Sequence, residues 1–524
     1  MTAGAAPRSP GPSPEDDASE VSRSEALFHA SDYAGAFDVL HARNIPAMPI
    51  PLLDRALPIL LMSGDATLGE EFSVTVLDDV ERQTADAAAP IASIVRTYRS
   101  EATAEPRRRA VLATAALEGL PAEAPIARHR ALAVLLAAKV DIGEGLDGHL
   151  LAQMEEVERE IDLVASVDSA LAQRGFLAYQ VGQLDESRTA LRLLKRKARA
   201  DQQPFIESVF ATHLATVDAY AGRLAAAAAL LDSYRGETPV SPAAARALGL
   251  IALRAADDVA FQEVLLQPTL QGSAIHGAFT RRALTGLGAA RREEWREAYS
   301  QLSRAQMHAR SLGLEEPGRR MWIDVDLARA AIAIGRPGEA ARISDNLERL
   351  SAGARPILDG MAGRIRGVIA GSDDPAASIA ILEESVAALA GAGFPDQLAL
   401  SLLELGRALT RAERYTDARK ALDRARVLTG LTGDRAIGLL VDRALRLTSS
   451  DALLAALTSR ERQIAFAAAR GATSREIAEA GFTSIRTVET QLSSAYRKLG
   501  ITSRAQLTVL LADHLRERAH DPES

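Results

Sequence analysis

Apolar residues recur at three- and four-residue intervals from about residue 24 to residue 447, and the alternation expected of strands is scarce. This spacing gathers apolar side chains on one face of an α-helix, so the pattern predicts a region that is helical almost throughout. Near residue 447 the pattern changes, and a shorter block with its own helix starts and stops follows. We therefore predict an all-α protein with a helical region over 23–447, a linker over 448–456 and a C-terminal module over 457–516.

The two ends of the chain are expected to be disordered. Residues 1–22 carry four prolines among serine, glycine and acidic residues. Few apolar groups are present there to offset the entropy that is lost on ordering. We expect the same of residues 517–524.

A weak repeat runs through the predicted helical region. Packing residues lie at offsets of 3, 12, 16 and 19 from Gly406, and the same spacing starts at Gly286 and, more loosely, at Gly175. A small residue on each helix lets two helices approach, and larger residues seal the groove between them. The spacing resembles the helix pair of the tetratricopeptide repeat (TPR), whose period is about 34 residues. The resemblance implies helix pairs that stack into a superhelix, and a non-repetitive helical domain is the alternative.

Further copies of the repeat are looser still. They are marked by Ala215 with Ala227 and Leu231, by Ala328 with Ala331 and Ala340, and by a half-copy ending in Ala36 and Leu40.

The C-terminal module shows four helix starts. The first two are capping boxes, in which a hydroxyl residue precedes a glutamate by three positions: Thr458 with Glu461, and Thr473 with Glu476. Serines begin the third and fourth helices, and a glycine ends each of the first three. Three capped helices with a tight turn between the second and third predict a helix-turn-helix. The third helix has a stripe predicted to be buried, made of Val488, Leu492, Ala495 and Leu499.

The charge of this module differs from that of the whole chain. Between residues 458 and 504 eight Lys/Arg outnumber four Asp/Glu, which gives a net charge of +4 within a chain of net charge -8. A locally basic module on an acidic chain is the electrostatic pattern expected where a protein contacts phosphates.

The module resembles the LuxR/GerE-type DNA-binding domain of bacterial transcription regulators. The matching pieces are LTSRE at its start, SREIA in the second helix, S-x-R-T-V-E in the third, YRKLG at that helix's end and the following TSR. The resemblance implies a four-helix domain whose third helix enters the major groove of double-stranded DNA. It also implies that the fourth helix can pair two copies, so that a homodimer forms on DNA.

The resemblance places the DNA-contacting residues one by one. It implies base-edge contacts from Glu489, Thr490 and Ser493. It implies contacts near phosphates from Arg486, Thr487, Arg497 and Lys498, and it adds Ser474 and Arg475 of the second helix to the interface. For any one of these side chains, a solvated helix face is the alternative.

Two positions depart from the common family pattern. Glu489 stands where a basic residue is frequent, and Gln491 stands where histidine is frequent. A glutamate can accept a hydrogen bond from a cytosine amino group but repels phosphate, so we expect a different sequence preference and modest affinity. In the fourth helix, Leu507, Leu510 and Leu511 form either a pairing surface or part of the module's own core.

Catalytic and cofactor sites are not predicted. The chain has no cysteine, and none of its five lysines follows a glycine, so the phosphate loop of the ATPase found in some large LuxR-type regulators is absent. Gly143, Gly145 and Gly148 spell G-x-G-x-x-G, but the preceding run is helix-like, so we interpret them as a turn between helices. Trp295 and Trp322 are interpreted as packing anchors, with a ligand cage as the alternative.

The sequence thus predicts a cytoplasmic DNA-binding transcription regulator without a membrane span, an enzymatic activity or a cofactor. The helical region is expected to receive a signal from a protein, a peptide or a small molecule. The alternative is a protein-interaction scaffold whose helix-turn-helix binds DNA weakly or not at all.

Overall fold

The computed structural model describes residues 14–29, 32–41, 48–68, 77, 89–161, 167–233, 241–271, 275–448, 454 and 457–511. These residues form helices joined by turns, without a strand among them. The predicted all-α class is therefore confirmed. Within the described residues, no helix is both long enough and apolar enough to cross a membrane.

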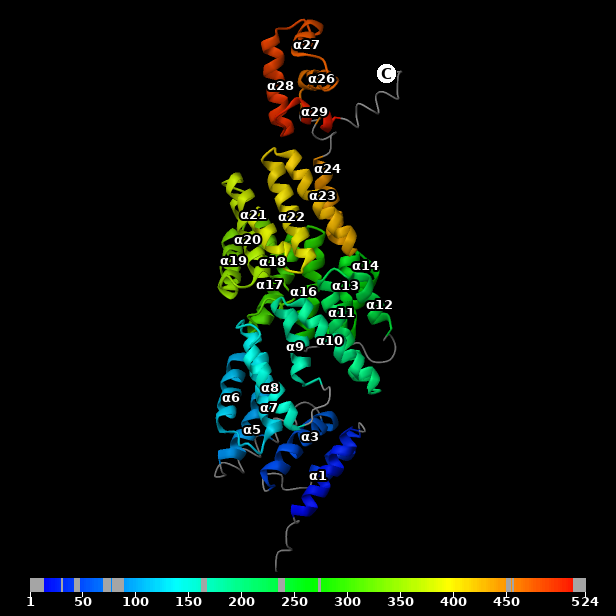
Figure 1. The fold of residues 1–524 in the computed structure, drawn as a ribbon, viewed down its shortest axis with the longest axis vertical. Coiled ribbons are helices and arrows are strands. Elements are labelled where there is room, and N and C mark those ends of the chain that lie inside the picture. Colours follow the sequence, from blue (N-terminus) through cyan, green and yellow to red (C-terminus); the bar gives the residue numbers. More distant parts are fainter. Residues whose placement is uncertain are drawn as a thin grey trace, which may run out of the picture. The chain divides into compact units, whose positions relative to one another are not determined.

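The chain divides into two compact units. Helices of both units are labelled in Figure 1. Unit 1 comprises residues 1–181, 189–207 and 309–319, and unit 2 comprises residues 182–188, 208–308 and 320–524. Unit 1 begins with α1 (Pro14–His29), α2 (Tyr33–His41), α3 (Ile50–Leu68) and α5 (Ala89–Ala102). It continues with α6 (Pro106–Gly119), α7 (Pro125–Asp141), α8 (Gly148–Ile161), α9 (Ala170–Ala178) and the 3₁₀ turn η2 (Tyr179–Val181).

Three helices contribute to both units, namely α10 (Leu184–Ala200), α11 (Pro204–Tyr220) and α17 (Trp295–Ser311). Unit 2 then contains α12 (Leu224–Asp232), α13 (Pro242–Ala255), α14 (Asp258–Leu265), α15 (Pro268–Gln271), α16 (Ile275–Arg291), α17 (Trp295–Ser311) and α18 (Asp324–Ala333), although the last residues of α17 count with unit 1. It continues with α19 (Pro337–Ser351), α20 (Pro356–Ala370), α21 (Pro375–Ala390), α22 (Pro395–Arg411), α23 (Tyr415–Thr432) and α24 (Arg435–Leu447). The C-terminal module holds α26 (Ser459–Ala469), α27 (Ser474–Ala480), α28 (Ile485–Leu499) and α29 (Arg504–Leu510).

The prediction of a disordered tail over residues 1–22 was wrong from Pro14 onward, where α1 begins. Proline suits the first turn of a helix because its missing N–H would be unpaired there, and Asp16 and Asp17 favour the positive end of the helix dipole. Val21 is fully buried in the core of unit 1. Residues 1–13 and 517–524 lie outside the described residues, and so does most of the predicted linker.

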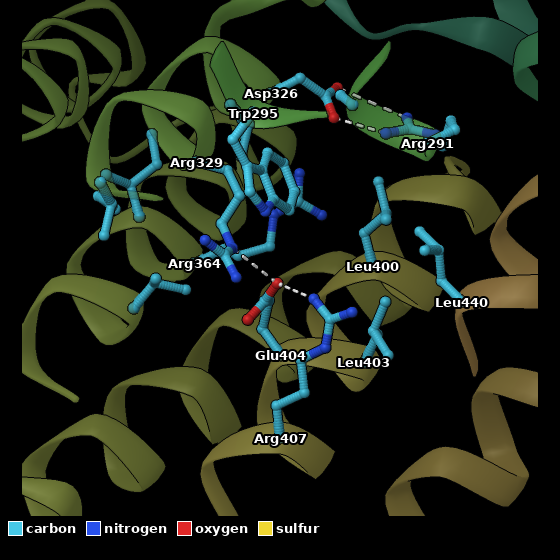
Figure 2. Close-up of a pocket in the computed structure, with 15 residues that line it drawn as sticks. Arg291, Trp295, Asp326, Arg329, Arg364, Leu400, Leu403, Glu404, Arg407 and Leu440 are labelled. Carbon is cyan, nitrogen blue, oxygen red and sulfur yellow. Dashed lines mark hydrogen bonds and ion pairs between the residues drawn. The ribbon is translucent and has the colours of Figure 1, made fainter. Parts of the chain in front are cut away.

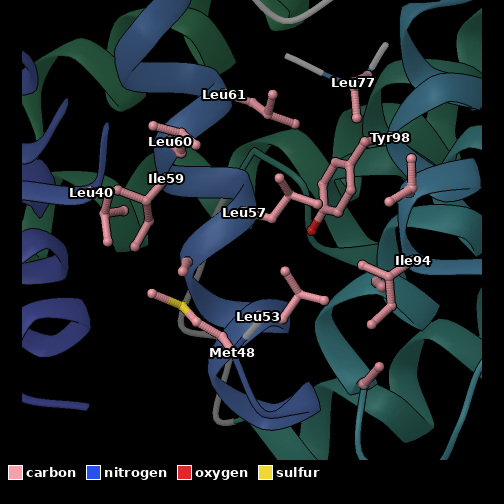
Figure 3. Close-up of a cluster of buried hydrophobic side chains, with 14 of the residues drawn as sticks. Leu40, Met48, Leu53, Leu57, Ile59, Leu60, Leu61, Leu77, Ile94 and Tyr98 are labelled. Carbon is pink, nitrogen blue, oxygen red and sulfur yellow. The ribbon is translucent and has the colours of Figure 1, made fainter. Parts of the chain in front are cut away.

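One core of unit 1 is built from α1, α2, α3, α5 and the first half of α7. Leu53 and Leu57 project from α3 toward Ile94 and Tyr98 of α5, as Figure 3 shows, and all four side chains are buried. Burying aliphatic and aromatic surface in this way supplies the main stabilising free energy of a helical unit.

The repeat predicted from the sequence is confirmed as a recurring close approach between paired helices. A Cβ atom added to Gly406 of α22 would lie 2.5 Å from Cγ of Leu422 in α23. The equivalent atom at Gly286 of α16 would lie 2.6 Å from Leu302 in α17. In the third copy, Gly175 would meet Leu191 at 2.9 Å. In each pair the glycine therefore makes room for the leucine sixteen positions later.

The looser copies of the repeat also place their marker residues in the interior. Every small or large residue that marks them is buried in the described helices: Ala36 and Leu40, Ala215, Ala227 and Leu231, and Ala328, Ala331 and Ala340. The helical region is therefore an array of helix pairs, of the kind that TPR spacing predicts.

Candidate nucleic-acid interface

The local signals in the C-terminal module produce the predicted helix ends. Oγ1 of Thr458 accepts a hydrogen bond from the backbone N–H of Glu461 at 3.2 Å, and the Glu461 carboxylate accepts one from the Thr458 N–H at 2.8 Å. Thr473 and Glu476 form the same reciprocal pair ahead of α27. The Ser484 hydroxyl accepts from the Thr487 N–H at 3.0 Å and caps α28. All three caps confirm what the sequence predicts.

A glycine in the left-handed region ends α28, at Gly500 with φ of 64°. Gly481 ends α27, as predicted, but without a left-handed conformation. Gly481 has a φ of -96°, and it is Phe482 that takes the left-handed conformation, with φ of 47°. The Phe482 side chain is fully exposed.

Helix α28 has two opposite faces. The predicted stripe of Val488, Leu492, Ala495 and Leu499 is buried in the core of the module. These residues pack with α26, α27 and α29 and hold α28 by one side only. The other side of α28 is consequently free to meet a partner.

The exposed side of α28 carries Arg486, Thr490, Ser493 and Arg497, all of which are exposed. Their spacing of four, seven and eleven residues from Arg486 puts them in one line along the helix. Neither guanidinium group in this line has a hydrogen-bond or ion-pair partner among the described residues. Two unpaired cations therefore flank two hydroxyl groups, which suits a helix that contacts phosphates at its ends and base edges between them.

The other residues predicted to contact DNA either lie beside this line or have side chains that already bond within the protein. Glu489 is exposed next to it, so its carboxylate faces the same surroundings as the two arginines. The Thr487 hydroxyl lies 2.8 Å from that of Ser484 within the cap. On α27, Ser474 is half-buried, and Arg475 forms an exposed ion pair with Glu479 at 3.0 Å, which water can displace at little cost.

Lys498 has a role that the sequence did not reveal. Its Nζ lies 2.7 Å from the carboxylate of Glu461, which is almost fully buried and also accepts a hydrogen bond from Ser494 at 2.8 Å. The hydrogen bond from Lys498 is the main cause that lowers the pKa of Glu461 to about 2. Lys498 therefore joins α28 to the start of α26, and its predicted phosphate contact stays a prediction that would require it to leave this pair.

Arg504 is the second residue whose role depends on tertiary structure. Its guanidinium donates to the carbonyl oxygen of Ala468 at 3.0 and 2.8 Å, and also to that of Ala472. The Ala468 carbonyl at the end of α26 also accepts a backbone hydrogen bond from Gly471 at 3.0 Å, so Arg504 adds a second donor there. Arg504 thus fastens α29 to α26.

The leucines of the fourth helix, α29, and Leu511 directly after it belong mainly to the module's own core. Leu507 and Leu511 are fully buried in the module's core, and Leu510 is partly buried against it. The interpretation of these three residues as a pairing surface is therefore wrong for Leu507 and Leu511, because their side chains are already covered within one copy.

The glycine-rich segment in unit 1 is a turn between two helices, as interpreted. It follows helix α7, and Gly143 and Gly145 both have a φ of 83°. Asp147 accepts hydrogen bonds from the N–H groups of His149 and Leu150 at 3.0 and 3.2 Å, so a carboxylate occupies the first turn of α8 where a phosphate would bind.

Comparison with known proteins concerns the C-terminal module most directly. Residues 455–511 match the family described as "GerE: Bacterial regulatory proteins, luxR family". This match covers the module alone and identifies it as a LuxR-type helix-turn-helix domain. No curated protein matches the chain.

Among solved structures, the chain is similar to one titled "Crystal structure of APC/C hetero-tetramer Cut9-Hcn1". The sequence identity is 14%, the TM-score is 0.45, and the alignment covers 83% of this chain and 84% of that chain. A likeness this distant assigns neither a partner nor an activity to the helical array.

Proposed function

We propose that this protein is a sequence-specific DNA-binding transcription regulator, with α28 as the helix that enters the major groove. The observation that carries the proposal is the line of Arg486, Thr490, Ser493 and Arg497 opposite the buried stripe of α28, in a module that matches a family of regulatory proteins. A helix held by one face and polar on the other fits a groove about 12 Å wide.

In this proposal the two arginines contact phosphates and set the register of the helix. Thr490, Ser493 and Glu489 then reach base edges, and a glutamate selects cytosine through its amino group. Ser474, Arg475, Thr487 and Lys498 complete the interface at its margins. Two modules binding as a homodimer would read two half-sites, which raises affinity beyond that of one module.

The helical array is proposed to receive the signal that controls DNA binding. Arrays of helix pairs present long surfaces to proteins, peptides or small ligands, and a bound ligand can shift the population of states that bind DNA. Two observations favour the scaffold alternative: Lys498 is engaged with Glu461, and Glu489 adds a negative charge to the same helix.

The test is selection of bound duplexes from a random-sequence pool by the full-length protein, beside a chain that ends at residue 447. Enrichment of a shared sequence by the full chain alone supports the regulator, and the spacing of half-sites reveals pairing. If neither protein enriches a sequence at low salt, while the full chain remains folded and captures a stable protein partner, the scaffold replaces the regulator.

A further inference from the structure

Six helices of unit 2 surround a cavity of about 40 Å³ (Figure 2). It lies within a wider depression whose empty space, open solvent included, is about 480 Å³. The wall comes from α16, α17, α18, α20, α22 and α24, and most of its side chains are aliphatic. The narrow part has room for roughly three water molecules, or for one small polar group.

The wall also carries four arginines but only two carboxylates. Arg291 pairs with Asp326 at 2.5 Å, and Arg329 and Arg407 each lie 3.0 Å from Glu404. Figure 2 shows Glu404 linked to two of these guanidinium groups. Burial raises the pKa of Glu404, but the charges of Arg329 and Arg407 outweigh it, and the pKa falls to about 2. Arg407 also pairs with Glu293, which lies outside the wall, at 2.5 Å. Each of these three arginines therefore has an ion-pair partner within the protein.

Arg364 is the fourth arginine, and it has no such partner. Its side chain is buried, and no carboxylate of the described residues lies within ion-pair distance of it. Nη1 donates to the backbone oxygen of Gln397 at 2.9 Å and Nη2 to its Oε1 at 2.7 Å. A guanidinium has five N–H donors, so three have no partner in the described structure. Burial lowers the pKa of Arg364 to about 10, yet the group remains charged at neutral pH.

The surroundings of this charge define what can neutralise it. A buried cation without a counter-ion is unfavourable, and one negative charge suffices here because the other three arginines are already paired. A dianion would face Asp326 and Glu404 without a second unpaired cation. Trp295, with Arg329 stacked 4.7 Å from its ring, adds a flat apolar surface beside the aliphatic wall.

We propose that this cavity binds a short organic monocarboxylate, with its carboxylate on the free donors of Arg364 and its apolar group against the aliphatic wall and Trp295. A planar carboxylate matches the fork of a guanidinium, and an aliphatic or aromatic tail extends into the wider depression. The idea that this ligand is the signal for the helical array rests on the proposed function. Its binding to the cavity does not depend on DNA.

The test is a calorimetric titration of the full-length protein, without DNA, with acetate, propionate, butyrate and benzoate at constant ionic strength. Chloride and inorganic phosphate serve as anion controls. We expect saturable binding of one acid per chain that tightens from acetate to the larger acids. Quenching of Trp295 fluorescence should follow the same curve and be lost in Trp295→Phe.

The variants separate this site from general anion binding. Arg364→Met should weaken the acids about tenfold or more, which is a loss of at least ~1.4 kcal/mol. Arg366→Gln is the matched control, because Arg366 lies on the same helix but is exposed and paired with Glu348. It should bind as the parent does. If Arg364→Met does not fold, Val368→Phe fills the wall without touching the charge and should block binding equally.

Three results would overturn the proposal: no acid binds, chloride or phosphate binds as well as the acids, or both arginine variants lose the same affinity. Failure of the proposed function shows in a different measurement, the selection of DNA duplexes. If the protein binds acids but selects no DNA sequence, the carboxylate site stands and only its role in regulation is refuted. Where both hold, adding butyrate or benzoate should change the affinity for the selected duplex in the parent and not in Arg364→Met.

Discussion

Replacing Gly406 by alanine tests the packing rule of the helix-pair array. The added Cβ would lie 2.5 Å from Cγ of Leu422, closer than real Cβ atoms come to such a neighbour, so the two helices must separate or Leu422 must leave its rotamer. Overpacking of this kind costs about 1–3 kcal/mol. Alanine also gains about 1 kcal/mol over glycine inside a helix. The net loss is therefore up to about 2 kcal/mol, a fall of roughly 2–5 °C in the unfolding midpoint.

Gly430 provides the matched control on the partner helix α23. It lies within the helix, is exposed, and an added Cβ would meet nothing within 4 Å. Gly430→Ala should thus increase the free energy of unfolding by about 0.5–1 kcal/mol through helix propensity alone, and the midpoint should rise accordingly. Circular dichroism and calorimetry of the full-length protein measure both midpoints under one set of conditions.

A double-mutant cycle then assigns the cost to one contact. Leu422→Ala alone should destabilise by about 2–5 kcal/mol because it leaves a cavity. In that background, Gly406→Ala no longer meets the leucine and should be neutral or stabilising, which gives a coupling energy of about 1–3 kcal/mol. An equal effect of Gly406→Ala in both backgrounds, or equal shifts for Gly406→Ala and Gly430→Ala, would refute the packing argument.

Three further predictions concern ionisable side chains. The lowered pKa of Glu461 gives the module stability that is present above about pH 4.5 and lost as the pH falls toward 2, so Glu461→Gln should flatten the acid limb of the melting profile. Glutamine can keep the capping box but not the ion pair with Lys498, so the variant should cost on the order of 1–2 kcal/mol at pH 7. Arg504→Met should lower the free energy of unfolding of the module by about 1–3 kcal/mol, because α29 loses its hydrogen bonds to the carbonyls of Ala468 and Ala472. The salt dependence of DNA binding by the folded protein should stay unchanged. The lowered pKa of Arg364 means that the unfolded chain binds more protons above about pH 10, so stability should rise with pH there in the parent and not in Arg364→Met.

The sequence was most informative where structure is decided locally. The two capping boxes of Thr458 and Thr473 and the cap of Ser484 depend on residues three positions apart, and all three form as predicted. The repeat of Gly406 with Leu422 was also readable, because both residues lie in one helix pair. The error at α1 came from giving composition more weight than a local signal: Pro14 followed by acidic residues is itself a helix start.

Features that depend on distant residues could not be read from the sequence. Lys498 looked like a phosphate ligand because its partner Glu461 lies 37 positions away. The Arg364 cavity is assembled from six helices between Ala290 and Leu440, and no spacing rule connects them. Trp295 was interpreted as a packing anchor, whereas it lines this cavity; Trp322, stacked edge-on against Phe394 at 5.2 Å, is a packing anchor as interpreted.

The most direct test of the account is the salt dependence of DNA binding by the full-length protein on its selected duplex, compared with Arg486→Ala/Arg497→Ala. Each phosphate contact contributes about 0.9 to the slope of log affinity against log salt concentration, so losing two contacts should reduce the slope by about 2 and weaken binding most at low salt. The control Arg419→Ala/Arg424→Ala removes two arginines from α23 and should leave the slope unchanged. An unchanged slope in the Arg486/Arg497 variant, or the same loss in the control, would contradict the assignment of α28 as the DNA-contacting helix.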